Sequence, residues 1–220
     1  VHILYLTTNR QENKAAHPRN LIVLDETAEV TLIESYAGLT EAPYFNNAVT
    51  EIVLGDAAVL KRYAVLHEGP RGYHLSSVRV QQHANSVFRS FSAFLGGKIA
   101  RNELKTRLAG EGADASLAGL YLAEGDQLID NATGIEHASP QCTSRIRYKG
   151  VLGDTSHAVF SGAGAGVDGG IMITASHNPA DYNGMKIVRA EARPLSGDTG
   201  LGTVAALAAD EDWCRGALAE

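Results

Sequence analysis

The chain has 220 residues, 45% of them hydrophobic and 20% charged, which supplies a packed core for one large domain or two small ones. Its formal net charge of −6 argues against nucleic acid as a partner, and its two cysteines are too few for a disulfide framework or a structural zinc site. No apolar run reaches the roughly 18–20 residues that a membrane span needs. We therefore expect a cytoplasmic protein with no nucleic-acid or membrane partner. The first residues, VHILYLTTNRQ, contain neither an initiator methionine nor a signal-peptide pattern, and we interpret the chain as a fragment or an excised piece.

From residue 21 onward, short apolar runs alternate with turn residues such as Gly-Asp, Gly-Glu and Ala-Asn. The predicted strands are Leu21–Leu24, Val30–Ile33, Val49–Leu54, Val59–Leu66, Leu75–Val80, Val87–Phe94, Leu104–Leu108 and Leu117–Leu122. No segment of helical period separates them, which excludes a doubly wound α/β fold and leaves a sandwich, a barrel or a solenoid. The loosely repeated unit of strand and turn favours the solenoid, in which each turn of chain stacks only on its neighbours.

Segments throughout residues 1–162 resemble one family. They include HPRNLIVLDETAEVTLIESY (17–36), NAVTEIVLGDAAVLKRY (47–63), FRSFSAFLGGKIARNELKTRLAGEGADASLAGLYLAEGDQLIDNATGIEHASPQCTSRIRYKGVL (88–152) and HAVFSG (157–162). These segments are similar to the core of the SufB/SufD proteins, and most similar to SufD, a scaffold component of iron–sulfur cluster assembly. The resemblance implies a mainly β protein with a right-handed parallel β-helix, SufB- and SufC-like partners, and little enzymatic chemistry of its own. It implies an iron–sulfur cluster only transiently and within a complex.

The histidines and Cys142 of this part of the chain offer few candidate ligands. Cys142 lies in the sequence near His137, and a thiolate with an imidazole is a possible iron site. The alternative is that Cys142 is a small apolar residue of a solenoid turn and His137 a turn residue. Five other histidines are isolated, and we interpret each as a surface residue or as hydrogen-bonded packing: His17, His67, His74, His83 and His157.

Two short basic alternations occur, one with Arg101, Lys105 and Arg107 and one with Arg145, Arg147 and Lys149. One interpretation places them on one face of adjacent turns, facing an acidic partner. The other is that they are solvated, outward-facing strand positions.

The sequence changes character across SGAGAGVDGG (161–170), a Gly/Ala-rich tract of the kind found in linkers or at the junction of two coding segments. We expect a boundary at 163–168, between a β-helix at 1–162 and a short α/β segment at 169–220. Within that segment the pattern predicts strands at Ile171–Thr174 and Met185–Val188 and a helix from Leu201 to Asp212.

Residues 164–213 contain TASHNP followed by DYNGMK, and they resemble the first α/β/α domain of the phosphohexomutases, the family of phosphomannomutase and phosphoglucomutase. The resemblance implies that Ser176 carries a phosphoryl group, that His177, Asn178 and Thr174 shape or line the phosphate loop, and that Lys186 is a general acid or base. It also implies that the phosphoserine helps to bind Mg²⁺ and that a hexose phosphate is the substrate. A phosphoserine adds a charge of roughly −1.5 to −2, which a divalent cation and a lysine can offset.

The aspartate run that holds Mg²⁺ in that family has no counterpart in this sequence, and neither do the family's sugar-recognition segments. Three interpretations therefore stay open. The chain is a truncated SufD-like scaffold component, or a phosphohexomutase, an isomerase of carbohydrate metabolism, with an incomplete active site. The third is a chimeric gene product with no single function.

Overall fold

In the computed structural model, residues 1–8, 14–165, 169–174, 184–189, 193–194 and 202 are described. These residues fall in two compact units, Val1–Ala163 and Gly164–Glu220. Among them, no helix is long and apolar enough to span a membrane. The predicted helix at 201–212 lies outside the described residues, apart from residue 202.

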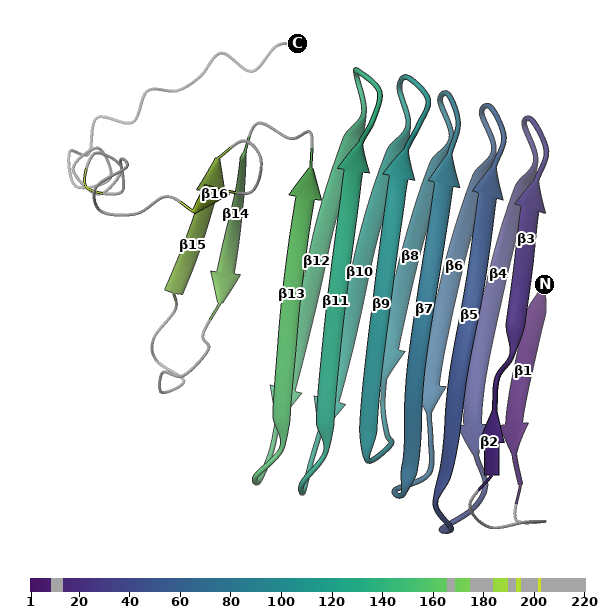
Figure 1. Cartoon of the computed structure of the whole chain (residues 1–220), viewed down its shortest axis with the longest axis vertical. Helices are drawn as coiled ribbons and strands as arrows, with labels where there is room; N and C mark the ends of the chain where they lie inside the picture. Colours follow the sequence, from purple (N-terminus) through teal and green to yellow (C-terminus); the bar gives the residue numbers. More distant parts are fainter. Residues whose placement is uncertain (9–13, 166–168, 175–183, 190–192, 195–201, 203–220) are drawn as a thin grey trace. The chain divides into compact units, whose positions relative to one another are not determined.

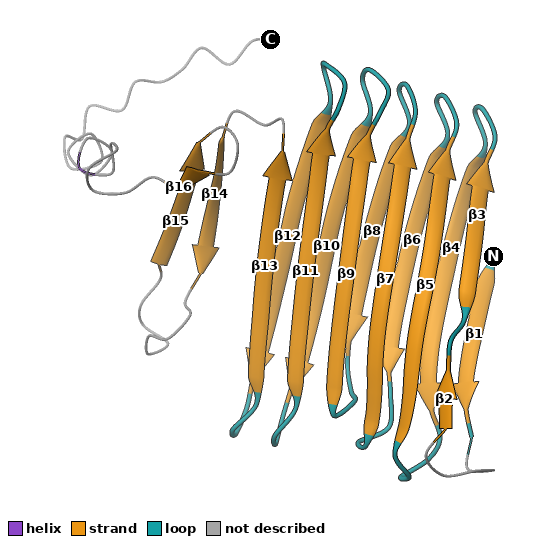
Figure 2. Cartoon of the chain, viewed as in Figure 1, coloured by secondary structure: helices purple, strands orange, loops and turns teal. Residues whose placement is uncertain are grey.

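The first unit is a parallel β-solenoid of about five turns built from two sheets (Figures 1 and 2). The six-stranded sheet has the order β1-β4-β6-β8-β10-β12, and the seven-stranded sheet has the order β13-β11-β9-β7-β5-β2, with β3 also paired to β5. The six strands of the first sheet are β1 (His2–Thr7), β4 (Glu29–Gly38), β6 (Val59–His67), β8 (Val87–Phe94), β10 (Asp114–Ala123) and β12 (Thr143–Leu152). The strands of the second are β2 (Lys14–Ala16), β3 (Arg19–Leu24), β5 (Tyr44–Leu54), β7 (Gly72–Gln82), β9 (Ile99–Leu108), β11 (Leu128–His137) and β13 (His157–Ala165).

The winding is right-handed. In Figure 1 the strands of the nearer sheet run upward, those of the farther sheet run downward, and successive turns advance in one direction. All eight strands predicted from the sequence are confirmed, and most are longer than expected. The pattern of apolar runs in the sequence does not single out β11 and β12, because polar residues interrupt both.

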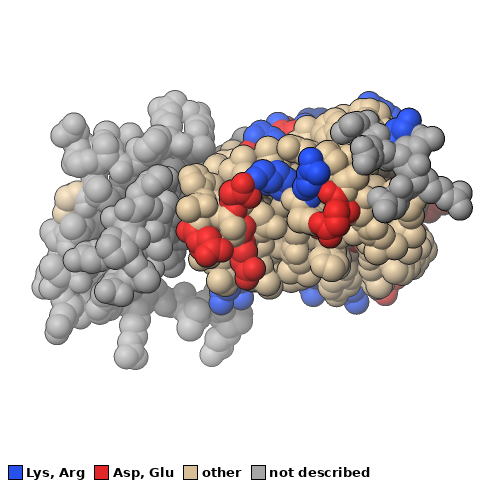
Figure 3. Space-filling model, turned by 90° about the horizontal axis from the view of Figure 1, so that it is seen from below, with Lys and Arg blue, Asp and Glu red and all other residues tan. Residues whose placement is uncertain are grey.

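Tight turns at one end of the solenoid share a local pattern. A residue with positive φ occupies the third position in five successive turns (Thr27, Ala57, Asn85, Gly112 and Gln141), spaced 27 to 30 residues apart. The next residue is small in every case (Ala28, Ala58, Ser86, Ala113 and Cys142). The turns also stack through backbone hydrogen bonds, such as Thr27 N to Asp56 O at 2.8 Å and Ala57 N to Ala84 O at 2.8 Å. At the other end, acidic and basic side chains lie side by side (Figure 3).

Inward-facing residues alternate along each strand with outward-facing ones. The apolar residues among them form two clusters in the core. The larger cluster includes Leu54, Leu60, Phe88 and Leu108, and the smaller one includes Tyr36, Leu66, Phe94 and Ile129. Buried polar residues lie between the two clusters on both sheets, and we call this set the polar belt. It consists of Glu34, Arg62, Ser90 and Ser92 from the six-stranded sheet and Thr50, Asn102, Asn131 and Thr133 from the seven-stranded sheet.

The second unit contains an antiparallel sheet of β14 (Gly169–Thr174), β15 (Gly184–Arg189) and β16 (Arg193–Pro194). In β14 and β15, Gly169 lies opposite Arg189 and Thr174 opposite Gly184. Both strands predicted for this segment are confirmed. The predicted phosphate loop at 175–183 lies between them, outside the described residues.

Candidate polar site inside the solenoid

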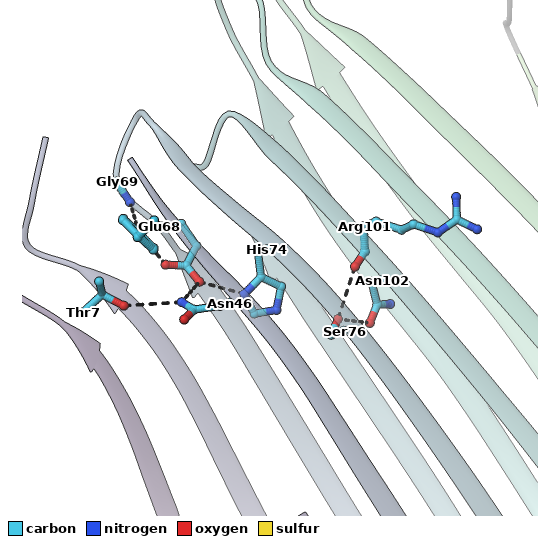
Figure 4. Close-up of polar contacts among 9 residues, drawn as sticks. Thr7, Asn46, Glu68, Gly69, His74, Ser76, Arg101 and Asn102 are labelled. Atoms are coloured by element: carbon cyan, nitrogen blue, oxygen red, sulfur yellow. Dashed lines mark hydrogen bonds and ion pairs between the residues drawn. The ribbon is translucent and has the colours of Figure 1, made fainter. Parts of the chain in front are cut away.

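A buried carboxylate, Glu68, lies in the turn between β6 and β7 and collects side chains from β5 and β7 (Figure 4). Tyr44 Oη donates a hydrogen bond to Glu68 Oε2 at 2.7 Å, and Asn46 Nδ2 donates one to Glu68 Oε1 at 3.0 Å. His74 Nδ1 lies 2.7 Å from the same Oε1. We call these four residues the Glu68 cluster. Because both Glu68 and His74 side chains have no exposed surface, the cluster ties the turn to the strands from inside the solenoid.

The sequence builds this cluster by strand alternation and by glycine. Tyr44 and Asn46 are two apart on β5, so both point inward. A Cβ added at Gly72 would lie 2.6 Å from the Tyr44 ring, and one at Gly38 would lie 2.0 Å from Tyr44 Oη. The Gly69 amide in turn donates a hydrogen bond to Tyr44 Oη at 2.7 Å. The glycines therefore leave the space that the tyrosine fills.

Burial and hydrogen bonding act against each other on the Glu68 carboxyl. Burial favours the protonated form, but hydrogen bonds from His74, Tyr44 and Asn46 outweigh it, and the pKa of Glu68 lies below its ordinary value. The carboxylate thus stays ionised inside the protein. Burial, reinforced by the neighbouring carboxylate, also raises the pKa of Tyr44 well above its ordinary value.

The imidazole of His74 is held from two sides. Its Nδ1 faces Glu68, and its ring meets Tyr36 edge-on with centroids 4.6 Å apart. Tyr36 stacks on Tyr5 at 4.3 Å. The buried Nε2 of His74 has no hydrogen-bond partner within the described structure. A carboxylate that orients an imidazole is a common arrangement of catalytic sites, but this pair lies where a substrate in solvent has no contact with it.

The polar belt contains a buried ion pair. Arg62 Nε donates to Glu34 Oε2 at 2.5 Å, with side chains that are 4% and 0% exposed. Arg62 Nη1 also donates to Ser90 Oγ at 3.4 Å, which links strands β4, β6 and β8. Several other buried polar atoms of the belt have no partner in the described structure, namely Glu34 Oε1, Ser92 Oγ, Asn102 Nδ2 and both side-chain polar atoms of Asn131. The solenoid therefore encloses a polar layer whose charges are paired and whose neutral groups are only partly satisfied.

Cys142 and His137 each make a hydrogen bond to another residue in the structure. Cys142 follows the positive-φ residue of its turn, as the alanines and serine do in the other turns, and its Sγ donates to Gly110 O at 3.3 Å. It packs against the larger apolar cluster. His137 ends β11, and its Nε2 lies 2.8 Å from Ser144 Oγ. Within the described residues there is no group of three or more histidine, cysteine, aspartate or glutamate residues placed to hold a metal ion.

The residues expected in the phosphate loop are only partly described. Ser176, His177 and Asn178 lie outside the described residues, while Thr174 ends β14 and Lys186 lies in β15 opposite Met172.

The sequence also predicts that the isolated histidines of the solenoid are surface residues or hydrogen-bonded packing. His74 is hydrogen-bonded packing, as expected.

Sequence reasoning missed the buried charges Glu34 and Arg62. A signal was present in their spacing: Glu34 lies between Leu32 and Tyr36 at period two, and Arg62 lies between Leu60 and Ala64. That alternation places both charged side chains on the inward face of their strands. What the local sequence does not contain is the partner, because the two residues lie 28 positions apart.

Comparison with known proteins matches this solenoid to one family model, "SUF system FeS cluster assembly, SufBD core domain", over residues 5–169. The chain belongs to the SufBD family. It is 28% identical to an iron–sulfur cluster assembly SufBD family protein of Synechocystis over 74% of this chain and 38% of that protein. It is 30% identical to the iron–sulfur cluster assembly protein SufD of Escherichia coli over 69% of this chain and 36% of that protein. The match to each of these SufBD relatives thus spans less than two fifths of the relative's length.

The C-terminal part matches a second family model, "Phosphoglucomutase/phosphomannomutase, alpha/beta/alpha domain I", over residues 151–212. It is 56% identical to the phosphomannomutase of Escherichia coli over 62 residues, which cover 28% of this chain and 14% of that enzyme. The two family matches overlap at residues 151–169, on β12, β13 and the start of β14.

Proposed function

We propose that this protein is a SufD-like component of an iron–sulfur cluster assembly scaffold in the cytoplasm, acting with SufB- and SufC-like partners. The observation that carries the proposal is the coincidence of the SufBD match with the solenoid, from β1 to β13. In this proposal the iron–sulfur cluster is the cargo of the assembly and is contacted only within the complex.

The interior supports a scaffold role. Glu68 and Glu34, the two buried carboxylates among the residues that the structure describes, each accept a hydrogen bond from a strand or turn other than their own. Such contacts fix the positions of neighbouring turns relative to one another, and a rigid frame is what an assembly partner needs from a scaffold. The thiol of Cys142, in the described part of the chain, lies in a turn and donates a hydrogen bond to the carbonyl oxygen of Gly110.

The test is co-purification. The tagged full chain is co-expressed with the SufB- and SufC-like proteins of its source, and we expect all three to elute together. Cys142→Ala is the matched variant, because alanine occupies the equivalent position in three other turns. We expect this variant to keep the complex and its iron content. Failure of the wild-type chain to bind either partner would refute the proposed function, and loss of iron in the variant would assign Cys142 a ligand role.

A second candidate function rests on the phosphomannomutase match and on the ASHNP sequence at 175–179. In it, Ser176 takes a phosphoryl group and passes it to a hexose phosphate, with His177, Asn178 and Thr174 around the loop, Lys186 as acid or base, and Mg²⁺ bound through the phosphoserine. The test is incubation with labelled glucose 1,6-bisphosphate and Mg²⁺. Label on the wild type that is absent from Ser176→Ala would support phosphoryl transfer, and an unlabelled wild type would remove it.

The joining of two family segments is itself a hypothesis. We propose a chimeric origin with a junction at 163–168, between the solenoid segment at 1–162 and the phosphohexomutase-like segment at 169–220. The genomic DNA across codons 155–170 tests it. One continuous reading frame in independent isolates would favour a genuine fusion, and an interruption there would show an artefact.

A further inference from the structure

The outer face of the six-stranded sheet gathers basic side chains. Strand alternation turns Lys61, Arg89, Arg145, Arg147 and Lys149 outward, and all five are exposed. We call the outward side of β4, β6, β8, β10 and β12 the basic face. It lies on a chain whose formal net charge is −6, so this concentration of positive charge is local.

The strand register arranges these residues in rows. Lys61 pairs with Arg89, Arg89 with Ser116, and Ser116 with Arg145, which makes one row across four strands. The next row is Ile33, Tyr63, Phe91, Ala118 and Arg147. Tyr63 and Phe91 are register partners on neighbouring strands, which lie about 4.8 Å apart. The two residues are 43% and 38% exposed.

On the outer face of the seven-stranded sheet, the cations form ion pairs with neighbouring acids. There Arg79 and Lys105 pair with Glu103 at 3.2 and 2.6 Å, Arg107 pairs with Glu136 at 3.3 Å, and Arg101 pairs with Asp130. On the basic face, none of the five cations has an ion pair within the described part of the chain. Its two outward acids, Glu29 and Asp114, lie in the row at one end.

We infer that the basic face is a docking surface for an acidic protein partner, whose carboxylates pair with the rows of cations around an apolar patch that covers Tyr63 and Phe91. Arginine and exposed aromatic residues are enriched at protein interfaces, and unpaired cations attract and orient an acidic surface. Five strands and about eight residues of length give a flat area of about 20 by 25 Å, or about 500 Å². An area of this size fits a transient, salt-sensitive contact rather than a permanent one.

Two other occupants fit less well. A nucleic acid favours a domain that is basic as a whole, whereas this chain is acidic, and aliphatic Ile33 shares the row with the aromatic rings. Within the described residues, three outward acids of the opposite sheet, Glu103, Asp130 and Glu136, are already paired with cations of the same sheet, so a second copy offers few free carboxylates there.

The test compares two double variants with the same change in charge. Arg89→Gln/Arg147→Gln removes cations from the basic face, and Arg101→Gln/Arg107→Gln removes two from the opposite face. The probe is a fluorescein-labelled, glutamate-rich peptide carrying two leucines, and its binding to the full chain is followed by anisotropy. We expect saturable, salt-sensitive binding that the basic-face variant weakens about fivefold to tenfold, while the opposite-face variant stays within about twofold. Circular dichroism and Arg89→Lys/Arg147→Lys, which keeps the charge, separate a lost contact from a lost fold.

Three kinds of outcome would overturn the inference. One concerns the peptide, which either shows no saturable binding or is bound equally weakly by the two glutamine variants. Another is tighter binding of a single-stranded oligonucleotide that is lost in the same basic-face variant. The third is concentration-dependent dimerisation in sedimentation that disappears in that variant, which would assign the face to a second copy of the chain.

Discussion

The solenoid and the C-terminal sheet differ in how their strands find partners. In the solenoid, Leu32 pairs with Arg62 and Arg62 with Ser90, so each strand depends on the turns of chain before and after it. In the C-terminal sheet, Gly169 pairs with Arg189 and Thr174 with Gly184, within a single local hairpin. The two units also match different families. Structure and function therefore have to be tested separately for each unit.

The largest expected effect comes from breaking the buried ion pair of the polar belt. Arg62→Met leaves the Glu34 carboxylate charged, buried and unpaired, and we expect the free energy of unfolding to fall by about 3–5 kcal/mol. Denaturant unfolding followed by circular dichroism measures it. The control is Glu34→Leu/Arg62→Met, which removes both charges and should recover most of the loss. If the double variant is as unstable as the single one, the pair itself is not the cause.

A cavity in the larger apolar cluster should have the next largest effect. Leu108 is fully buried, and Leu108→Ala should lower the free energy of unfolding by about 2–5 kcal/mol. Leu122→Ala is the matched control, because Leu122 is 40% exposed on the outer side of β10. Equal losses in the two variants would contradict the assignment of inward and outward faces.

The buried titratable groups predict two pH windows for the solenoid. Because the folded-state pKa of Glu68 is depressed, its contribution is present above its unfolded value of about 4.5 and is lost as the pH falls below it. We expect Glu68→Gln to cost about 1–3 kcal/mol at neutral pH and to flatten the acid dependence of stability. An acid dependence that is identical in both proteins would show that Glu68 is not a source of it.

The second window is alkaline. Burial raises the pKa of Tyr148 to about 12, so its contribution is present below its unfolded value of about 10 and is lost as the pH rises from there to about 12. We expect Tyr148→Phe to reduce the loss of stability across this range, measured by denaturant unfolding at several pH values. A wild-type tyrosine absorbance titration completed near pH 10 would contradict the burial of this phenol.

The smallest effect is expected at the surface ion pairs. Arg107 and Glu136 are both more than half exposed, and Arg107→Ala should change the free energy of unfolding by no more than about 0.5 kcal/mol. Thermal unfolding at low and high salt measures this. A loss similar to that of Arg62→Met would mean that the ion pairs on the outer face of the seven-stranded sheet, rather than the polar belt, hold the turns in register.

Much of this fold follows from period-two alternation and turn residues. The eight predicted strands are present, and the winding agrees with the family resemblance. β11 escaped prediction because Asn131 and Thr133 occupy its inward positions, where the sequence pattern expects apolar residues. β12 escaped because Arg145 and Arg147 dominate its outward side at the edge of the sheet.

The candidate site was less predictable, for a physical reason. The sequence indicates that His74 is packing, but its partner Glu68 lies in a turn, and the network depends on Tyr44 and Asn46 from the preceding strand of the same sheet. Likewise, the two basic alternations do not share a face, because β9 and β12 belong to different sheets. Local sequence gives the direction of a side chain, whereas its partner is set by the stacking of turns nearly 30 residues apart.

The most direct test of the scaffold proposal is the affinity of the full chain for the SufB-like partner, measured by calorimetry for three proteins. We predict that Ser176→Ala binds as tightly as the wild type, because the interaction belongs to the solenoid, and that Arg62→Met binds only in proportion to the fraction of it that is folded. Loss of binding in Ser176→Ala, or full binding by Arg62→Met under conditions in which circular dichroism shows it unfolded, would contradict the account.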